Sequence, residues 1–309
     1  MKNIVCFGEV LWDMLPSGKK LGGAPLNVAL RAQSVGNQVK VISAVGNDDS
    51  GKEILEKITS YSASIDHIQV NKELETSKVI VSLNEKGSAT YRIKFPCAWD
   101  AIHLLNRDIE IVKNSDAFIY GSLVARNQVS RETLFELLKY APFKVFDINL
   151  RPPHYNLETL KKLMSYADFI KFNDDELLGI CKDFGQNEAS LEECMRYISK
   201  ETNTPRICVT RGAEGAILLH NNEMVYNKGY TVTVADTVGS GDSFLAIVVS
   251  KILEGADAQD TIDYASAMGA IVASKSGANP KVSAEEMETM LKGGARAELK
   301  RSKSLDFLE

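Results

Sequence analysis

Cysteine, histidine and tryptophan are scarce in this chain, whose 309 residues include five, four and two of them. The cysteines and histidines are scattered, and no cysteine pair has the spacing of metal ligands, so a structural zinc site is not expected. Most of the cysteines lie in apolar runs, which predicts buried free thiols and a reducing, cytoplasmic location.

An excess of positive charge is also missing. The chain has 36 Lys and Arg against 41 Asp and Glu, whereas a nucleic-acid surface needs clustered basic residues. No apolar run reaches the length of a membrane span, and Met1 leads directly into strand-like residues, so a signal peptide is not expected. With 44% hydrophobic residues, the composition predicts a soluble globular protein without nucleic-acid or membrane partners.

The main pattern that is present is an alternation of short apolar strands with helical stretches. Strands are expected at residues 4–10, 39–45, 117–121, 144–149, 169–173 and 207–210. Helices are expected at residues 25–34, 52–61, 131–140, 158–166, 192–201 and 258–274. Strands alternating with helices predict a parallel sheet that is covered on both faces. Ligands of such sheets bind beyond the carboxyl ends of the strands.

Two hairpins interrupt the alternation and are expected to lie outside the parallel core. Residues 78–83 and 89–95 flank the turn-like residues 84–88, and residues 216–220 and 224–226 flank a shorter turn. The first hairpin is expected to project as a small β lid, together with residues near 11–20. Residues 293–309 are charged and poorly patterned, which predicts a surface helix or a loose tail.

The stretch from Asp236 to Phe244 carries the strongest chemical signal. A glycine–serine–glycine turn ends in Asp242 and precedes an apolar run, which predicts that the turn opens a helix. The first amide groups of a helix lack internal partners and, with the helix dipole, favour an anion. A carboxylate beside them can take the proton of an alcohol during phosphoryl transfer. An ordinary aspartate cap on a buried helix is the alternative.

A second glycine-rich segment, from Gly46 to Lys52, has the spacing of a P-loop. Glu53 stands where a P-loop needs a serine or threonine hydroxyl for magnesium, and Asp48 and Asp49 would repel phosphates. We therefore interpret this segment as a tight structural connection between a strand and a helix.

Other candidate residues follow the expected strands. Glu9, Asp13, Gly23 and Asn27 come after the first strand, and their side chains or backbone suit a polyol, although turn and cap chemistry explains them too. A later strand ends in polar residues that face one way, where an arginine can meet a phosphate: Asp147, Asn149 and Arg151. Two further strands end in residues suited to a nucleotide or to a capping box: Asn173, Glu176, Thr210, Gly212 and Gly215.

Two signatures in this chain resemble those of the ribokinase/PfkB family of sugar kinases. The first is Gly22-Gly23-x-x-x-Asn27 with Gly46-x-Asp48-x-x-Gly51. The second is Asp236-Thr237-x-Gly239-Ser240-Gly241-Asp242, with Ser240 where alanine is commoner. The resemblance covers nearly the whole chain and implies an α/β fold, a Rossmann-like three-layer sandwich with a mostly parallel sheet and a small β-sheet lid. It implies one ribokinase-like domain over residues 1–309, with the lid contributed by about 11–21 and 76–100.

The resemblance also implies roles for individual residues. Asp242 would be the catalytic base, and the anion hole would be formed by the amides of Gly239, Ser240 and Gly241. Sugar-binding positions would include Asp13, Gly23 and Asn27, and Asn173 with Glu176 would hold Mg²⁺ indirectly. The nucleotide would be lined by Thr210, Gly212, Gly215, Gly277 and Asn279. Asp236, with carbonyl groups near Val238 and Ser274–Gly277, would bind a monovalent cation such as K⁺.

The activity implied is transfer of the γ-phosphoryl group of Mg-ATP to a primary hydroxyl of a small sugar. Residues 8–16 and 22–29 are most similar to bacterial fructokinases, so fructose is the expected substrate. Ribokinase and 2-keto-3-deoxygluconate kinase activities stay open, as does a catalytically silent, sugar-sensing homologue. A homodimer through the β lid is the expected assembly.

Overall fold

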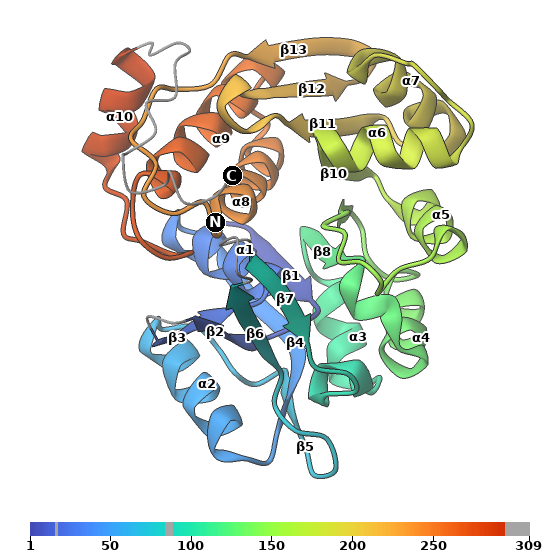
Figure 1. Cartoon of the computed structure of the whole chain (residues 1–309), viewed down its shortest axis with the longest axis vertical. Coiled ribbons are helices and arrows are strands. Elements are labelled where there is room, and N and C mark those ends of the chain that lie inside the picture. The colour runs from blue at the N-terminus through green and yellow to red at the C-terminus, as the bar shows by residue number, and fades with distance from the viewer. Residues whose placement is uncertain (16–17, 84–88, 294–309) are drawn as a thin grey trace.

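A large mixed sheet forms the centre of the molecule in a computed structural model, which describes residues 1–15, 18–83, 89–293 (Figure 1). Its strands follow the order β13-β12-β11-β10-β9-β8-β1-β4-β5. Their bounds are β1 Asn3–Phe7, β4 Gln38–Gly46, β5 Ile68–Asn71, β8 Ala117–Gly121, β9 Lys144–Asp147, β10 Phe169–Asn173, β11 Arg206–Thr210, β12 Ala216–His220 and β13 Glu223–Asn227. The strands from β11 to β5 pair in parallel, whereas β12 and β13 add an antiparallel edge.

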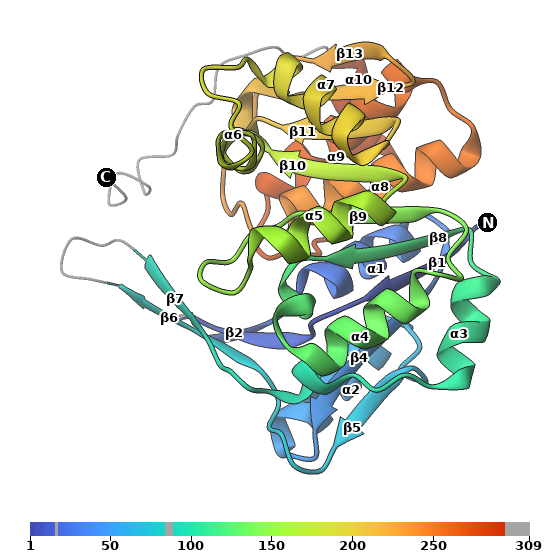
Figure 2. The same ribbon diagram turned by 90° about the vertical axis from the view of Figure 1, so that its right-hand side faces the viewer.

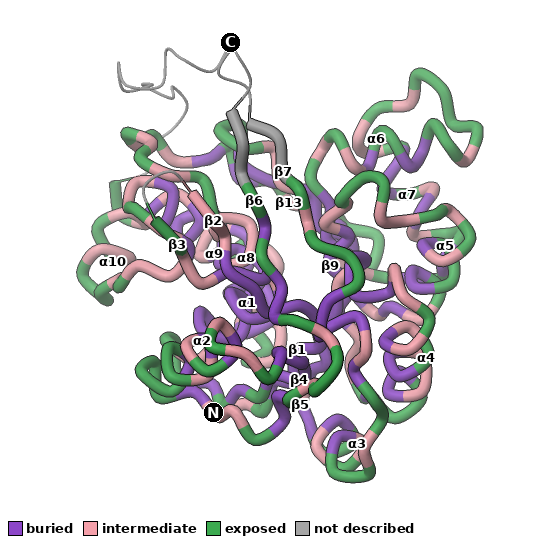
Figure 3. The backbone as a smooth tube through the Cα atoms, turned by 60° about the horizontal axis from the view of Figure 1, so that its bottom comes forward, coloured by how far each residue is buried: buried purple, intermediate pink, exposed green. Residues whose placement is uncertain are grey.

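Helices cover both faces of this sheet, as expected for parallel strands joined by crossovers. One face packs against α1 Ala24–Ser34, α2 Asp49–Ser60, α8 Ser240–Glu254 and α9 Ala258–Ala273, with α10 Ala284–Gly293 outside α9. The other face packs against α3 Asn106–Lys113, α4 Gln128–Leu137, α5 Leu157–Tyr166, α6 Asp174–Asp183 and α7 Leu191–Thr202. Figure 3 shows the result: central strands are buried, and exposed residues lie on the outer helices. The expected three-layer α/β fold is confirmed.

A second, smaller sheet has the strand order β3-β2-β6-β7. It is formed by β2 Leu11–Leu15, β3 Gly18–Gly22, β6 Lys78–Leu83 and β7 Ala89–Ile93. The β6–β7 hairpin extends away from the body of the molecule in Figure 2. Residues 16–17 and the expected turn at 84–88 lie outside the described residues, as do residues 294–309 of the expected C-terminal tail.

Element boundaries differ from the sequence expectations where backbone geometry intervenes. The expected strand at 4–10 ends at Phe7, because Gly8 turns the chain at φ +149° and a Cβ there would lie 2.7 Å from Pro25 Cγ. The expected strand at 144–149 ends at Asp147, and Asn149 takes a φ of +40°. Helices α2 and α4 begin three residues earlier than expected because Asp48 and Asn127 cap their first turns.

The P-loop-like segment, residues 46–52, makes contacts that stabilise the connection between β4 and α2. Asp48 accepts hydrogen bonds from the Gly51 amide (2.8 Å) and from the Thr76 amide (2.8 Å) and hydroxyl (2.7 Å). A Cβ on Gly51 would lie 2.2 Å from the Gly46 carbonyl oxygen, so the glycines allow this tight packing. Lys52 points to Asp49 at the exposed surface. Among the described helices, none is long and apolar enough to cross a lipid bilayer.

Candidate active site

The N-terminus of α8 lies at the carboxyl edge of the parallel strands. Gly239 caps the helix at φ +77°, and a Cβ there would lie 2.6 Å from the Ala278 Cα and carbonyl oxygen, so glycine is required. The Ser240 amide donates to the Thr237 carbonyl (3.3 Å). One of the three amides expected in the anion hole therefore already has a hydrogen-bond acceptor within the protein. The amides of Gly241 and Asp242 belong to the first turn, where an α-helix offers them no internal acceptor. This turn can hold an anion.

Asp242 stands beside that turn with a fixed orientation. Its Oδ2 accepts a hydrogen bond from the Asn27 side-chain amide (2.8 Å), and Asn27 Oδ1 in turn accepts one from Asn279 (2.8 Å). Burial raises the pKa of Asp242 to about 6, and the charge of Asp147 adds to the rise, while Asn27 and Lys171 oppose it. A carboxylate with this pKa is ionised at neutral pH and can accept a proton.

Lys171 is a site residue that the sequence interpretation missed. It lies on β10 directly opposite Asp147 on β9, and its Nζ donates to Asp147 Oδ1 at 2.9 Å. Both side chains are buried, at 8% and 5% exposure. A lysine in a central strand that is covered on both faces is rare, and this anomaly in the run Phe169–Asn173 was a usable signal.

Asn173 and Glu176 form a reciprocal capping box at the start of α6. The Glu176 amide donates to Asn173 Oδ1 (2.7 Å), and the Asn173 amide donates to Glu176 Oε2 (2.9 Å). Glu176 Oε1 accepts from the Leu150 amide (2.8 Å), so this carboxylate also holds the β9–α5 loop. Burial raises the pKa of Glu176, and the nearby Lys171 limits the rise.

The donor set near Glu176 suits Mg²⁺ that is held through water. Both Glu176 oxygens already accept backbone hydrogen bonds, so direct coordination would cost those bonds. In the described part of the chain, no cluster of three or more His, Cys, Asp or Glu forms a metal site. Mg²⁺ usually keeps several waters and binds together with substrate phosphates, which these contacts permit.

The other side of Asp242 presents acidic and basic groups from β2 and nearby loops. Burial raises the pKa of Asp13 to about 6, and the charges of Arg151 and Lys20 oppose the rise. Burial likewise raises the pKa of Glu9 to about 7, and no group in the described part of the chain bonds to the buried Oε2 atom of Glu9. These groups can exchange hydrogen bonds with a polyol.

Gly23 and Asn149 shape this side through the backbone. A Cβ on Gly23 would lie 2.3 Å from the Glu9 carbonyl oxygen, and Gly23 takes a φ of +112° at the N-cap of α1. Asn149 lies between β9 and the exposed Arg151, and its carbonyl accepts a 3.5 Å hydrogen bond from Ser122. The structure therefore brings Asp13, Gly23, Asn27, Asp147, Asn149 and Arg151 to the same edge of the sheet.

A cavity of about 430 Å³ opens beside the N-terminus of α8, and Ser240 and Gly241 contribute to its lining. Four of the expected nucleotide residues line it, namely Asn173, Thr210, Gly212 and Gly215. Its walls also include residues that the sequence interpretation did not single out, namely Tyr230, Val232, Val234, Phe244, Gly269, Ala270 and Ala273. Apolar walls beside a helix N-terminus suit a flat base joined to phosphates.

Gly277 and Asn279 are not among the residues that line this cavity, so their contact with the nucleotide stays a prediction. The Gly277 amide donates to Asp236 (3.1 Å), and Asn279 donates to Asn27 (2.8 Å). These contacts connect them with the loop before α8 and with α1. Asn279 therefore supports the orientation of Asp242 through Asn27.

The oxygens of the Asp236 carboxylate are already engaged, so this side chain is not free to coordinate a monovalent cation. Its Oδ1 accepts from the Val238 amide (3.1 Å), and its Oδ2 accepts from the Gly277 amide (3.1 Å) and from Lys20 Nζ (3.2 Å). Burial alone would raise the pKa of Asp236, but these hydrogen bonds and the Lys20 charge lower it. Lys20 already supplies the positive charge that a bound K⁺ would bring.

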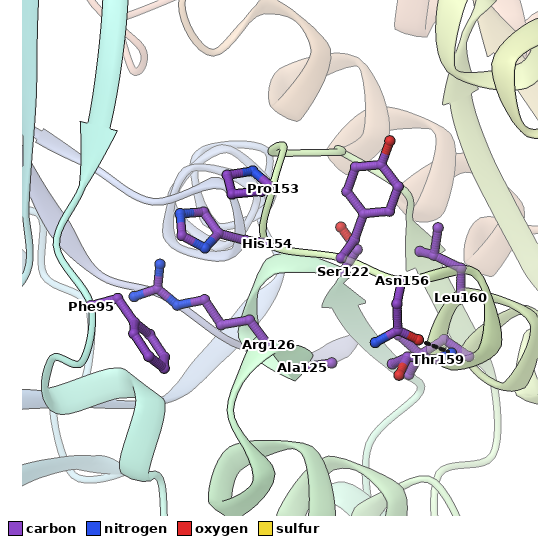
Figure 4. Close-up of a pocket in the computed structure, with 11 residues that line it drawn as sticks. Phe95, Ser122, Ala125, Arg126, Pro153, His154, Asn156, Thr159 and Leu160 are labelled. Atoms are coloured by element: carbon purple, nitrogen blue, oxygen red, sulfur yellow. Dashed lines mark hydrogen bonds between the residues drawn. The ribbon is translucent and has the colours of Figure 1, made fainter.

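A separate cavity of about 180 Å³ lies behind the β9–α5 loop (Figure 4). Arg126, which lies 4.0 Å from the Trp99 ring, is paired with Asp100 through two 2.7 Å hydrogen bonds. Its guanidinium charge is thus neutralised within the protein. Of the cavity's lining residues, Ser122 connects it to the candidate site, through Asn149. Its lining, within the described part of the chain, includes neither Asp242 nor any residue of the first turn of α8.

The site lies at the carboxyl edge of a parallel sheet that helices cover on both faces. It combines a helix N-terminus with an adjacent carboxylate, and this arrangement suits phosphoryl transfer. The family model described as pfkB family carbohydrate kinase matches residues 1–285. The chain belongs to this family, whose members are sugar phosphotransferases.

Individual relatives agree with the family assignment. Fructokinase-2 of Solanum habrochaites is 28% identical, with 94% of this chain and 97% of the relative covered. The structure of Xylella fastidiosa fructokinase with bound ATP superposes with a TM-score of 0.82 at 22% identity, covering 94% and 98% of the two chains. A Vibrio cholerae fructokinase double mutant with fructose, ADP and potassium ion gives 0.79 at 23% identity, covering 94% and 98%. At these identities the two structures show the shared fold.

Proposed function

We propose that this protein transfers the γ-phosphoryl group of Mg-ATP to a primary hydroxyl of fructose, at its 6-position. The single observation that carries the proposal is the place of Asp242. It lies at the N-terminus of α8, between the polar groups of the β1, β2 and β9 segments and the cavity lined by Thr210 and Gly212. A base there can reach a hydroxyl on one side while phosphates occupy the other.

In the proposed reaction, Asp242 takes the proton of the sugar hydroxyl. The hydroxyl oxygen forms a bond to the γ-phosphorus, the bond from that phosphorus to the β,γ-bridging oxygen breaks, and ADP leaves. The amides of Gly241 and Asp242 stabilise the charge on the phosphoryl oxygens during transfer. Asn173 and Glu176 would hold Mg²⁺ through water, and the ion would supply positive charge to the nucleotide phosphates.

Fructose is favoured by the fructokinase names of similar proteins and by the polar groups available to a polyol. Asp13 is a half-buried carboxylate that an incorrect sugar would leave without a hydroxyl partner, and the charge of Arg151 acts on it from nearby. Ribose and 2-keto-3-deoxygluconate are the alternative substrates. Asp13→Ala should lower kcat/KM for the true substrate, because a buried sugar hydroxyl loses its partner. The expected rise in the corresponding activation free energy is about 2–4 kcal/mol.

The test is a measurement of ADP release by purified protein with fructose, ribose and 2-keto-3-deoxygluconate. A kcat/KM for fructose at least about tenfold above the others supports the proposal, since a buried polar group left without its partner costs about 1–3 kcal/mol. A preference for ribose would move the chain to the ribokinase activity and leave the mechanism unchanged. Product analysis by ³¹P NMR would separate the 6-phosphate from the 1-phosphate.

Asp242→Asn is the control that separates a kinase from a sugar-sensing homologue. This variant should lower kcat by about 10²–10⁴ while fructose affinity changes little, because the amide keeps the size of the carboxylate but cannot accept the proton. Fructose binding without turnover by the wild-type protein would instead support the sensor.

We further infer that β2, β3, β6 and β7 act as a lid over the sugar within one domain. Support comes from Asp13, which lies on β2 and faces the charges of Arg151 and Lys20. Ile80 on β6 is 54% exposed, which is consistent with a homodimer through this sheet. Light scattering coupled to size exclusion would test the dimer.

A further inference from the structure

We propose that Lys171 is a catalytic residue whose ammonium group contacts the transferring phosphoryl group at the N-terminus of α8. The proposal rests on the kinase function proposed above and adds a residue to its machinery. It assigns Asp147 the task of holding Lys171 in place.

The position of the ammonium group is the first support. Side chains alternate across β10, so Phe169, Lys171 and Asn173 point toward the sheet face that α8 covers. A Cβ built on Gly241 would lie 3.5 Å from Lys171 Nζ, and Nζ would be its nearest neighbour. The ammonium group therefore flanks the first turn of α8, beside the amides that can hold an anion.

Hydrogen-bonding capacity is the second support. A lysine ammonium carries three donors, and Asp147 Oδ1 accepts one of them at 2.9 Å. The remaining donors are available at the side that Gly241 leaves open. Asp147 Oδ2 is a buried atom with no hydrogen-bond partner among the described residues, so the pair retains further capacity for a ligand or water.

The balance of charge is the third support. Asp147, Glu176 and Asp242 all act electrostatically on Lys171. Burial alone would lower the pKa of Lys171, but these carboxylates raise it above its usual value and keep the group charged. Three carboxylates around an anion site would repel a triphosphate. A buried cation at their centre offsets that repulsion where the phosphoryl charge is transferred.

The same two strands provide a structural pair for comparison. Lys144 on β9 lies 3.6 Å from Asp168, at the amino ends of β9 and β10 and therefore away from α8's first turn. Their side chains are 20% and 40% exposed, whereas those of Lys171 and Asp147 are 8% and 5% exposed. Burying an ion pair is expensive. The buried Arg126–Asp100 pair engages both carboxylate oxygens, whereas Lys171 donates to Oδ1 of Asp147 only, which leaves this pair with capacity for a ligand.

The experiment measures the binding of ATP and ADP by isothermal titration calorimetry, without sugar and at pH 8, where Asp242 is ionised. Lys171→Met should weaken ATP binding by at least about tenfold and ADP binding by less than about threefold, since the lost charge-assisted contact is to the γ-phosphoryl group. Lys144→Met should leave both affinities within about twofold, as expected for a partly exposed pair. With a sugar substrate, Lys171→Met should also lower kcat by about 10²–10³.

Equal losses for ATP and ADP, or no loss for either, would overturn the proposal. Should Lys171→Met fail to fold because Asp147 is left unpaired, the double variant Lys171→Met/Asp147→Asn removes both charges, and the ATP-to-ADP ratio is read there. This ratio needs no turnover. A wild-type protein that binds ATP but phosphorylates no sugar would refute the kinase function, while the ratio would still decide the contact with Lys171.

Discussion

The side-chain amide of Asn27 on α1 donates a 2.8 Å hydrogen bond to the Asp242 carboxylate on α8, although 215 positions separate the two residues. One turn further along α1, the buried Arg31 donates to the Ser243 hydroxyl (3.0 Å) and to the Pro280 carbonyl (2.9 Å). Two neighbouring residues of α1 thus hold the start of α8 and the loop after α9. Asn27 therefore orients the proposed base, in addition to any contact with sugar.

Asn27→Leu should lower kcat and raise the pKa that governs the acid side of the rate profile. The Asn27 amide stabilises the charged form of Asp242, so its removal favours the protonated form. The loss of rate should be largest near pH 6 and smaller at pH 8. Asn37→Leu is the matched control, because Asn37 also bonds to α8, at Ser250 (2.9 Å), but far from the site. An unchanged pH profile in Asn27→Leu would contradict the positioning role.

The wild-type enzyme should lose kcat/KM as the pH falls below about 7. Burial raises the pKa of Asp242 and of Asp13 to about 6 and that of Glu9 to about 7, and only ionised Asp242 can accept the proton. Because these carboxyls are close together, the profile should report apparent values of the group. A rate that stays constant from pH 8 to pH 5 would exclude a carboxylate base with this pKa.

The sequence predicted the fold, and the helix that begins at the turn before Asp242, because each depends on local patterns. The strand–helix alternation and the turn at Gly239–Asp242 are each formed by residues that are close in the chain, so composition and spacing are enough to predict them. The contacts that link distant elements, such as Asn27 with Asp242 or Lys20 with Asp236, leave no mark in the spacing. The hydrogen bond from Asn279 to Asn27 is a further example, because 252 positions separate the two residues.

Asp48→Ala should destabilise the protein without changing the affinity for ATP. The variant loses the cap of α2 and the bonds to Thr76, which together are worth about 1–3 kcal/mol. Burial alone would raise the pKa of Asp48, but hydrogen bonds from Thr76 and Gly51 lower it. Its contribution is therefore present above the unfolded-state pKa near 4 and is lost as the pH falls through the lower folded-state value.

Lys52→Ala is the companion variant for the P-loop-like segment. Lys52 is 69% exposed and pairs with Asp49, so urea unfolding and ATP affinity should both stay near the wild-type values. Loss of ATP binding in Lys52→Ala would revive the P-loop interpretation of residues 46–52.

Gly239→Ala should disable the anion site. The new Cβ would lie 2.6 Å from the Ala278 backbone at a φ of +77°, so the turn must shift and its amides with it. Gly255→Ala, at the other end of the same helix, provides the control: its φ is +79°, and the added Cβ would meet no atom of the described residues within 4 Å. Both variants should lose about 1 kcal/mol of stability from the strained φ, but only Gly239→Ala should lose kcat. Equal kcat in the two would refute the requirement at Gly239.

The contact between Lys20 on β3 and Asp236 before α8 leads to a prediction about monovalent cations. Because the Lys20 ammonium group already neutralises Asp236, the wild-type rate should differ by less than about twofold between KCl and NaCl at equal ionic strength. Lys20→Met frees one Asp236 oxygen from its cation and should make the rate rise with K⁺. Lys19→Met is the control, since Lys19 lies next to Lys20 in the chain but pairs with Glu53 instead. Strong K⁺ activation of the wild-type enzyme would show that the carbonyl groups around Val238 and residues 274–277 bind the cation without the help of the Asp236 side chain.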